Sequence, residues 1–211
     1  MFDDEPGGAT PIDPDEAEEL IPGHIQTRSD LNEWEQANII GAARWVRTAT
    51  ESALAESTIL GLHKRMFDRT WEWAGRYRTS DKNIGVYWAE IGVEIRKFVD
   101  DGACWLENQV SGVDEAAARL HHRLVLIHPF PNGNGRHARL WCDLLLRQNG
   151  RPMFSWSSEE LDRAGESRRT YIDALRRADG GDFEPLLTLL LRNRDWGVQH
   201  DPSSHEEVID P

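Results

Sequence analysis

The stretch HPFPNGNGRHAR, residues 128–139, decides how the rest of this sequence is interpreted. An apolar-rich segment precedes it at residues 116–127, and another follows it at residues 140–146. Gly133 and Gly135 lie between these segments, and glycine reaches positive φ angles without a steric penalty, which interrupts a helix. The sequence therefore predicts two helices joined by a glycine-rich turn.

The predicted turn has the composition of an anion site. A glycine-rich turn that leads into a helix presents backbone N–H groups and the positive end of the helix dipole to an anion. Arg136 and Arg139 share a face in the first turn of that helix, and guanidinium groups bind phosphate oxygens bidentately. His128 is a candidate acid or base, with a reference pKa of roughly 6.5. The residues thus predict a polyphosphate site with a histidine at its rim.

The same stretch resembles the signature of the Fic/Doc superfamily, HxFx(D/E)GNGRxxR. Asn132 stands where the signature has an acidic residue. The segment LHKRMFDRTWEWAGRYR, which begins at Leu62, is also similar to these proteins, and the resemblance covers roughly residues 25–195. With its opening GATPIDPDEAEELIP, the chain looks most similar to the small Fic proteins called mobile mystery protein B. The signature positions that match are His128, Phe130, Gly133, Asn134, Gly135, Arg136 and Arg139.

The resemblance implies a protein adenylyltransferase, which moves AMP from ATP to a Tyr, Thr or Ser hydroxyl of a target protein. It makes His128 the general base, and it makes Phe130 a core residue that fixes the loop. It implies that Asn134, with the backbone of Gly133 and Gly135, holds the α- and β-phosphates. The β- and γ-phosphates would be held by Arg136 and Arg139. ATP is then the co-substrate, with Mg²⁺ beside Asn132.

Residues 75–88, GRYRTSDKNIGVYW, place turn-forming residues between two β-prone pieces, which predicts a small hairpin. In the family this hairpin is a flap, on which a segment of the target protein adds as a strand. Ile84, Gly85 and Val86 are the candidates for that contact. Lys82 is a candidate for a further phosphate contact.

Other activities remain open at this stage. Doc-like kinases carry a lysine at the position of Gly135, so the glycine favours AMP transfer over phosphorylation. Transfer of UMP or phosphocholine is a further alternative, and so is a catalytically weak module that binds a nucleotide. A zinc site of His121, His122 and His128 would lack a fourth ligand and matches no common spacing.

Many Fic proteins are inhibited by a glutamate that contacts the second arginine of the signature, here Arg139. Glu33 and Glu35 are the candidates, although neither lies in a strict match to the inhibitory motif. The alternative is that both are solvated charges on a helix surface, as glutamates usually are. Inhibition would then come from a separate antitoxin-like partner or be absent.

The composition of the 211 residues, 39% hydrophobic and 29% charged, suits one globular domain with a sizeable core. The net charge of −13 argues against a protein that coats nucleic acid, but it allows a local basic pocket. The two cysteines are too few for a disulfide framework. No secretory segment opens the chain, and its apolar runs are too short to span a membrane. We expect a cytoplasmic protein.

The predicted fold is an all-α bundle with the one hairpin. The resemblance implies a Fic domain at residues 25–198, which would follow an acidic arm at residues 1–24 and precede a polar tail at residues 199–211. The arm carries eight acidic residues and no Lys or Arg, so it either lies loosely on the surface or contacts a partner. Helices are expected to begin near Asp30 with a capping box to Glu33, and after Ser57, and to contain Ile91–Val99, Ala117–Ile127, Leu140–Leu146, Ser157–Leu175 and Phe183–Leu191.

Overall fold

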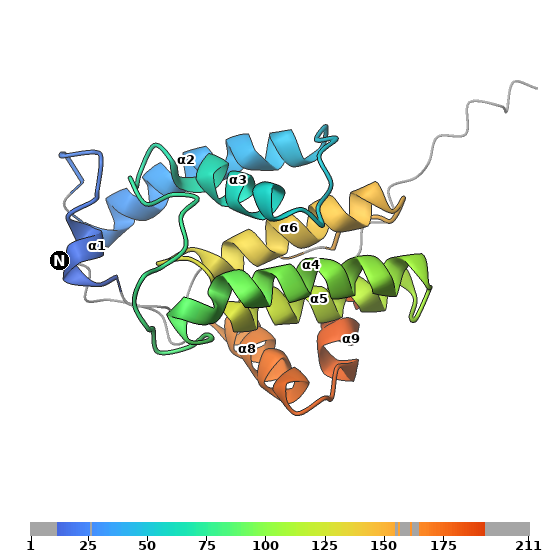
Figure 1. Ribbon diagram of the computed structural model, residues 1–211. Helices are drawn as coiled ribbons and strands as arrows, with labels where there is room; N and C mark the ends of the chain where they lie inside the picture. The colour runs from blue at the N-terminus through green and yellow to red at the C-terminus, as the bar shows by residue number, and fades with distance from the viewer. Residues whose placement is uncertain (1–11, 26, 155, 157–160, 162–164, 193–211) are drawn as a thin grey trace, which may run out of the picture.

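The computed structural model describes residues 12–25, 27–154, 156, 161 and 165–192. In this part of the chain the regular structure is helical and no β-strand forms (Figure 1). The predicted all-α fold class is therefore confirmed. The helices are α1 (Pro14–Ala17), α2 (Arg28–Val46), α3 (Glu56–Phe67), the 3₁₀ helix η1 (Trp88–Glu90), α4 (Ile91–Glu107), α5 (Val113–Ile127), α6 (Asn134–Gln148), α8 (Glu166–Asp179) and α9 (Glu184–Arg192).

Helix α6 lies at the centre of the bundle. It packs against α2 and α3 on one side and against α5 on the other (Figure 1). Helices α4 and α9 pack on α5, and α8 packs on α9. Trp141, Cys142 and Leu144 on α6 have no exposed surface. A helix that is apolar on nearly all sides is buried in this way because every face meets another element.

Helix α2 begins earlier than the sequence indicated. Its capping box joins Thr27 and Asp30: each side chain accepts a hydrogen bond from the backbone N–H of the other at 3.1 Å. The predicted box between Asp30 and Glu33 is therefore wrong. Thr27 also satisfies the cap pattern, and its earlier position leaves Asp30 as the third helical residue.

The predicted hairpin does not form. Residues 75–88, which we call the flap loop, contain turns and bends without a strand pair. The loop instead bonds through its own polar groups to α1 and to the turn after α5, as described below. Because these contacts satisfy its backbone groups, a strand pair is not required.

The C-terminal helices agree with the predictions in part. The helix predicted from Ser157 through Leu175 is interrupted at Gly165, an extended glycine that caps α8, so α8 begins only at Glu166. Tyr171 and Leu175 are buried on α8, and Leu186 and Leu190 are buried on α9. Gly150, with φ of +67°, follows the end of α6, as expected for a helix C-terminus. The predicted cap at Ser157 and Glu160 lies outside the described residues.

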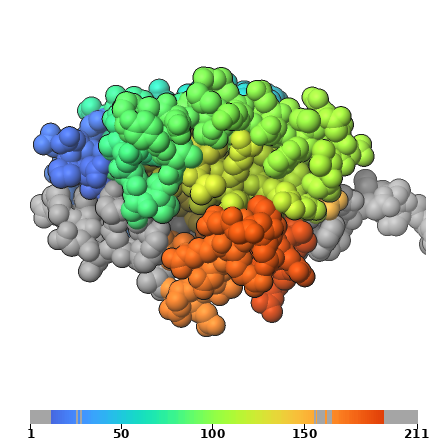
Figure 2. Space-filling model, turned by 60° about the horizontal axis from the view of Figure 1, so that its bottom comes forward, coloured from blue at the N-terminus to red at the C-terminus, as the bar shows by residue number. Residues whose placement is uncertain are grey.

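Residues 12–25 pack against the body of the protein. The N–H of Ile21 donates to the carbonyl of Thr70 at 2.9 Å, and the N–H of Glu72 donates to the carbonyl of Glu19 at 3.0 Å. Figure 2 shows this blue segment against the green surface of the chain that follows α3. No helix among the described residues is long and apolar enough to cross a membrane.

Candidate active site

His128 ends α5 in a left-handed conformation, with φ of 53° and ψ of 59°. Such a conformation is uncommon for a residue with a Cβ and reverses the chain into the turn of residues 129–133. The Nδ1 atom of His128 lies 3.3 Å from the carbonyl oxygen of Val125. A carbonyl only accepts, so this contact requires a proton on Nδ1 and makes Nε2 the acceptor nitrogen of the neutral ring.

Burial keeps this imidazole neutral. His128 is 4% exposed, and its burial lowers its pKa to about 4, with smaller contributions from the positive charges of Arg78 and Lys82. A neutral ring with an acceptor nitrogen is the form that a general base needs.

Asn134 closes the glycine-rich turn on itself. Its Oδ1 accepts from the backbone N–H of Phe130 at 2.9 Å, and its Nδ2 donates to the carbonyl of Phe130 at 2.8 Å. Both ends of the amide are thus used within the protein. The side chain fixes the shape of the loop, a role that differs from the phosphate contact expected of it.

His63 supports the same turn from α3. Its ring stacks on Phe130 with 3.7 Å between centroids. Its Nδ1 accepts from the N–H of Gly75 at 3.0 Å, so the proton is on Nε2, which lies 3.1 Å from the carbonyl oxygen of Asn132. Burial places the pKa of His63 well below its usual range, so the ring is neutral and its hydrogen-bond directions are fixed.

Gly133 and Gly135 differ in the space around them. Gly133 has φ of +77°, and a Cβ there would lie 2.5 Å from the ring of Phe67, so only glycine fits. A Cβ at Gly135 would meet nothing within 4 Å. Gly135 is in the first turn of α6, where helical N–H groups attract anions. A methyl group would therefore fit beside the first turn of α6.

The two arginines of the turn point to different helices. Arg136 donates from Nη1 to Oε2 of Glu35 on α2 at 2.6 Å, and its guanidinium lies 5.0 Å from the ring centroid of Phe67. Arg139 is 6% exposed and bonds the hydroxyl of Tyr171 on α8. Arg136 is thus the more accessible of the two.

A buried polar network surrounds Arg139. The Tyr171 hydroxyl lies 2.8 Å from Nε2 of His121, and burial raises the pKa of Tyr171 to about 12. Asp143 accepts from the indole N–H of Trp156 at 2.8 Å, and burial raises its pKa to about 7 although the charge of Arg139 opposes this shift. The side chain of Arg139 is therefore part of the buried polar network with Tyr171 and Asp143.

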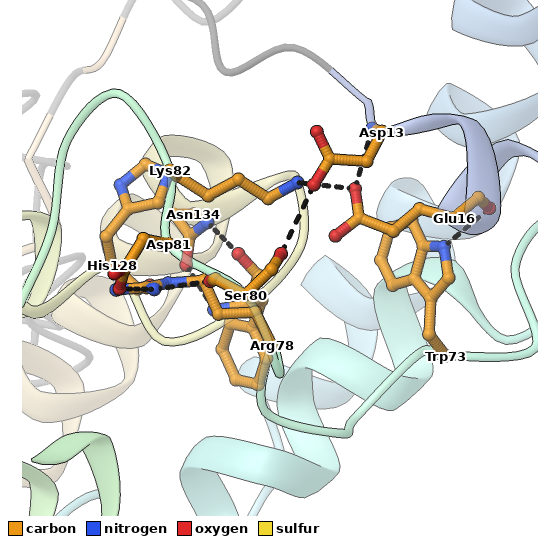
Figure 3. Close-up of polar contacts among 10 residues, drawn as sticks. Asp13, Glu16, Trp73, Arg78, Ser80, Asp81, Lys82, His128 and Asn134 are labelled. Atoms are coloured by element: carbon orange, nitrogen blue, oxygen red, sulfur yellow. Dashed lines mark hydrogen bonds and ion pairs between the residues drawn. The ribbon is translucent and has the colours of Figure 1, made fainter. Parts of the chain in front are cut away.

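The flap loop lies directly against His128 (Figure 3). A Cβ on Gly85 would lie 2.8 Å from the Cβ of His128, and the N–H of Val86 donates to the carbonyl of Ile127 at 3.4 Å. Ile84 is 44% exposed. The residues predicted to contact a target are thus at the rim of the site, with Ile84 the most available.

Lys82 extends from the flap loop toward α1 (Figure 3). Its Nζ lies 2.6 Å from a carboxylate oxygen of Asp13 and 2.6 Å from one of Glu16. Only 2% of its side chain is exposed. The candidate phosphate contact is therefore occupied by two carboxylates of the N-terminal segment.

Comparison with known proteins agrees with this geometry. Residues 53–146 match the model of the Fic/DOC family. This chain belongs to the Fic/DOC family. It is 30% identical over 145 residues to the protein adenylyltransferase fic-1 of Caenorhabditis elegans, an alignment that covers 67% of this chain and 27% of the worm protein. It is 24% identical to the probable protein adenylyltransferase y4lH of Sinorhizobium fredii, covering 80% of this chain and 87% of y4lH.

Solved Fic structures have the same fold. The crystal structure of BepC from Bartonella tribocorum with bound AMPPNP superposes with a TM-score of 0.64 at 20% identity, covering 83% of this chain and 95% of BepC. A structure of Fic-1 (residues 134–508) from C. elegans superposes with a TM-score of 0.61 at 27% identity, covering 83% of this chain and 51% of that one. This chain therefore spans about a quarter of the full worm protein and half of its solved portion.

The Fic signature in this chain lacks its acidic residue, and the surroundings of Asn132 do not form a metal site. Its Oδ1 accepts from the N–H of Gly133 at 2.7 Å and lies 3.4 Å from Nη2 of Arg136. A neutral oxygen beside a guanidinium is a poor ligand for a hard cation. Among the described residues, no three His, Cys, Asp or Glu side chains form a group that could hold a metal ion.

The two candidate inhibitory glutamates of this Fic chain differ in burial and in their contacts. Glu33 is exposed, whereas Glu35 is 3% exposed and bonds both Arg136 and the indole N–H of Trp71. The prediction that one of them contacts Arg139 is wrong. The carboxylate of Glu35 contacts Arg136, the first arginine of the signature. The reason is that Arg139 points toward α8, away from α2.

Sequence reasoning missed three groups in this Fic domain. Arg78 bonds the carbonyl of His128, His63 supports the turn, and the carboxylates of α1 bind Lys82. The only signal for Arg78 was its place at the end of the family-like segment WAGRYR. His63 lies near the start of the same family-like segment, but no pattern in the sequence indicated its two hydrogen-bond partners, Gly75 and Asn132, which are 12 and 69 residues away.

Proposed function

We propose that this chain is a protein adenylyltransferase, which transfers AMP from ATP to a side-chain hydroxyl of a target protein. One observation carries the proposal: the neutral imidazole of His128 is at the end of α5, and the turn that follows it leads into the first turn of α6, which contains Gly135. A base thus adjoins a preorganised anion site, which is the pair of functions that phosphoryl-type transfer needs.

In the proposed reaction, Nε2 of His128 takes the proton of the target hydroxyl. The hydroxyl oxygen then forms a bond to the α-phosphorus of ATP. The bond between that phosphorus and the oxygen that bridges it to the β-phosphorus breaks, and pyrophosphate leaves. The N–H groups at the start of α6 and the guanidinium of Arg136 stabilise the charge on the phosphates, and Arg139 is a second proposed contact.

The protein groups give Mg²⁺ little support, since Asn132 is neutral and already engaged. Mg²⁺ that accompanies ATP would be bound chiefly by phosphate oxygens and water. The steps above need only the groups of this chain and the nucleotide. The AMPPNP named for BepC supports an adenine nucleotide as the donor.

Gly135 favours AMP transfer over the kinase reaction, because Doc-like kinases carry a lysine at this position, whereas here a Cβ would meet nothing within 4 Å. Two observations favour a second candidate, a nucleotide-binding module with weak turnover. Glu35 occupies one edge of Arg136, and Asn132 replaces a carboxylate. We propose that the target protein docks over Ile84 and that Glu35 or an antitoxin-like partner limits the activity.

Incubation with ATP labelled separately on the α- and γ-phosphates tests the proposal. Label from the α-position on protein, either an added target or the chain itself, supports AMP transfer. Label from the γ-position would indicate a kinase. Nucleotide binding without transfer of label from either position to protein would support the second candidate, the nucleotide-binding module with weak turnover. The His128→Ala variant is the control, because it removes the base and leaves the anion site in place.

A further inference from the structure

Arg78 is among the largest side chains that are almost fully buried, with 2% of its surface exposed. Its Nε donates to the carbonyl of His128 at 2.7 Å and its Nη1 donates to the carbonyl of Ser80 at 2.7 Å. Its Nη2 donates to the carbonyl of Val86. Its own backbone N–H donates to the carbonyl of Pro129 at 2.9 Å. One residue therefore ties the turn after α5 to both halves of the flap loop.

This arrangement is costly for a fold to maintain. A buried guanidinium loses its hydration, and carbonyl dipoles compensate less than a carboxylate would. The nearest carboxylate is that of Asp81, 3.7 Å away and 59% exposed. An apolar side chain would fill the same volume without this cost. The placement of a charge here is better explained by the groups that it orients.

Arg78 bonds the backbone at His128 and Pro129, where the chain has an unfavourable conformation. His128 has positive φ, a conformation that other packing must maintain. The carbonyls of His128 and Pro129 are the next two groups along the chain, and Arg78 bonds both. Gly85 closes on the same point, since a Cβ there would lie 2.7 Å from Nη2 of Arg78 and 2.8 Å from the Cβ of His128.

We propose that Arg78 is the positioning residue for the general base, holding the His128 backbone and the flap loop in register with each other. It touches neither substrate nor the reacting atoms. It acts by fixing the direction of the His128 ring and the distance from that ring to the rim at Ile84 and Val86. This inference rests on the proposed function.

The charges around His128 are consistent with this role. The positive charges of Arg78 and Lys82 both lower the pKa of His128 in addition to its burial. The carboxylates of Asp13 and Glu16 offset Lys82, and Asp81 lies on the exposed side of Arg78. Removal of the Arg78 charge should therefore raise the pKa of His128.

The test compares Arg78→Met and Arg78→Lys with Arg76→Met, a matched control on the same segment whose side chain is 61% exposed. AMP transfer is followed with α-labelled ATP. Both Arg78 variants should lower kcat by about 10²-fold, because a misplaced base costs that much, with KM for ATP nearly unchanged. Arg76→Met should retain the wild-type kcat. An unchanged kcat in a folded Arg78 variant would overturn the proposal.

A second measurement does not depend on turnover. NMR titration of the His128 ring in the free protein should give a higher pKa in Arg78→Met than in Arg78→Lys or wild type. If the wild type transfers no AMP, the proposed function fails while this titration still tests the position of Arg78. Should Arg78→Met not fold, Arg78→Lys is compared with the wild type instead, because lysine keeps the charge but lacks the planar fork that bonds the carbonyls of His128, Ser80 and Val86. A wild-type His128 spectrum in the tested variant would contradict the inference.

Discussion

Glu35 and Arg136, from helices α2 and α6, form an ion pair with 2.6 Å between Oε2 and Nη1. The other carboxylate oxygen of Glu35 accepts from the indole N–H of Trp71 at 2.7 Å. The acid is therefore held in place by a second partner, and it occupies one edge of the guanidinium that the proposed phosphate site uses. In the proposed function, the carboxylate of Glu35 and a phosphate of ATP would therefore compete for the guanidinium of Arg136.

Removal of the Glu35 charge should strengthen nucleotide binding. In Glu35→Gln the amide can still accept from Trp71, but it no longer competes with phosphate as an anion. We expect ATP affinity to rise by about tenfold, or about 1.4 kcal/mol, which is close to the lower end of the roughly 1.5–3 kcal/mol of a hydrogen bond to a charged group, and AMP transfer to rise with it. Calorimetric titration and α-label transfer measure the two effects.

Glu33→Gln is the matched control, because Glu33 is on the same helix and exposed. It should leave both quantities at their wild-type values. Weaker ATP binding by a folded Glu35→Gln protein would mean that Glu35 orients Arg136 for the phosphates instead of competing with them.

Replacement of His128 by Ala should remove AMP transfer without removing ATP binding. Loss of a general base typically lowers the rate by about 10²- to 10⁴-fold. The α6 N-terminus and Arg136 remain in the variant, so ATP affinity should change little. Single-turnover transfer and calorimetry on one preparation check both statements, and an unchanged transfer rate would exclude His128 as the base.

The pH dependence of transfer should reflect the lowered pKa of His128. A base must be neutral to accept a proton, and burial lowers this pKa to about 4. The value of kcat/KM should therefore stay nearly flat from about pH 8 down to about pH 5.5, where an ordinary histidine with a pKa of roughly 6.5 would be mostly protonated. A fall in kcat/KM centred near pH 6.5 would contradict the environment described for His128.

The Asn132→Asp change should lower the Mg²⁺ concentration that the reaction requires. The new carboxylate can still accept from the N–H of Gly133, and its second oxygen adds a charged ligand for a hard cation. Rates measured over a Mg²⁺ series give the half-saturating concentration. An unchanged requirement would indicate that residue 132 does not face the metal.

The folded protein should lose stability as the pH falls from about 6.5 toward 4. Burial lowers the pKa of His121 to about 3, those of His128 and His137 to about 4, and that of His63 well below its usual value. The unfolded chain takes up protons near pH 6.5 while the folded state does not, so each such histidine costs up to about 1.4 kcal/mol per pH unit.

Asp143 opposes this trend. Its pKa is raised to about 7, so its contribution is lost as the pH rises from about 4 to 7. Four histidines outweigh one carboxyl, and the net slope is positive. Urea unfolding at several pH values measures it, and Asp143→Asn should steepen it. Equal or greater stability at about pH 5 than at about pH 7 would refute the prediction.

The fold was largely readable from the sequence because it follows from apolar periodicity. Residues 140–146 are apolar on nearly every side, and such a segment must lie between other elements, as α6 does. The flap loop was misread as a hairpin. Its turn residues and β-prone pieces are compatible with paired strands. In the structure, however, the carbonyls of Ser80 and Val86 accept hydrogen bonds from the side chain of Arg78 and not from a partner strand.

The positions of the candidate site residues were predictable, but several of their contacts were not. The spacing of the signature places His128 and Arg136 at the ends of two helices, since helix boundaries are local. That Glu35 bonds Arg136 and that Asp13 bonds Lys82 depends on how distant segments pack. Helical spacing put Arg136 and Arg139 on one face, yet long side chains on one face can bend to different neighbours, here α2 and α8.

The carboxylates that pair with Arg136 and Lys82 come from residues 13–35, before the segment that matches the family model. The matched segment supplies the cations, and the chain ahead of it supplies their counterions. In the proposed function, entry of a triphosphate would exchange one set of anions for another. We therefore expect sequence changes ahead of the signature to alter nucleotide affinity while every residue of the signature stays the same.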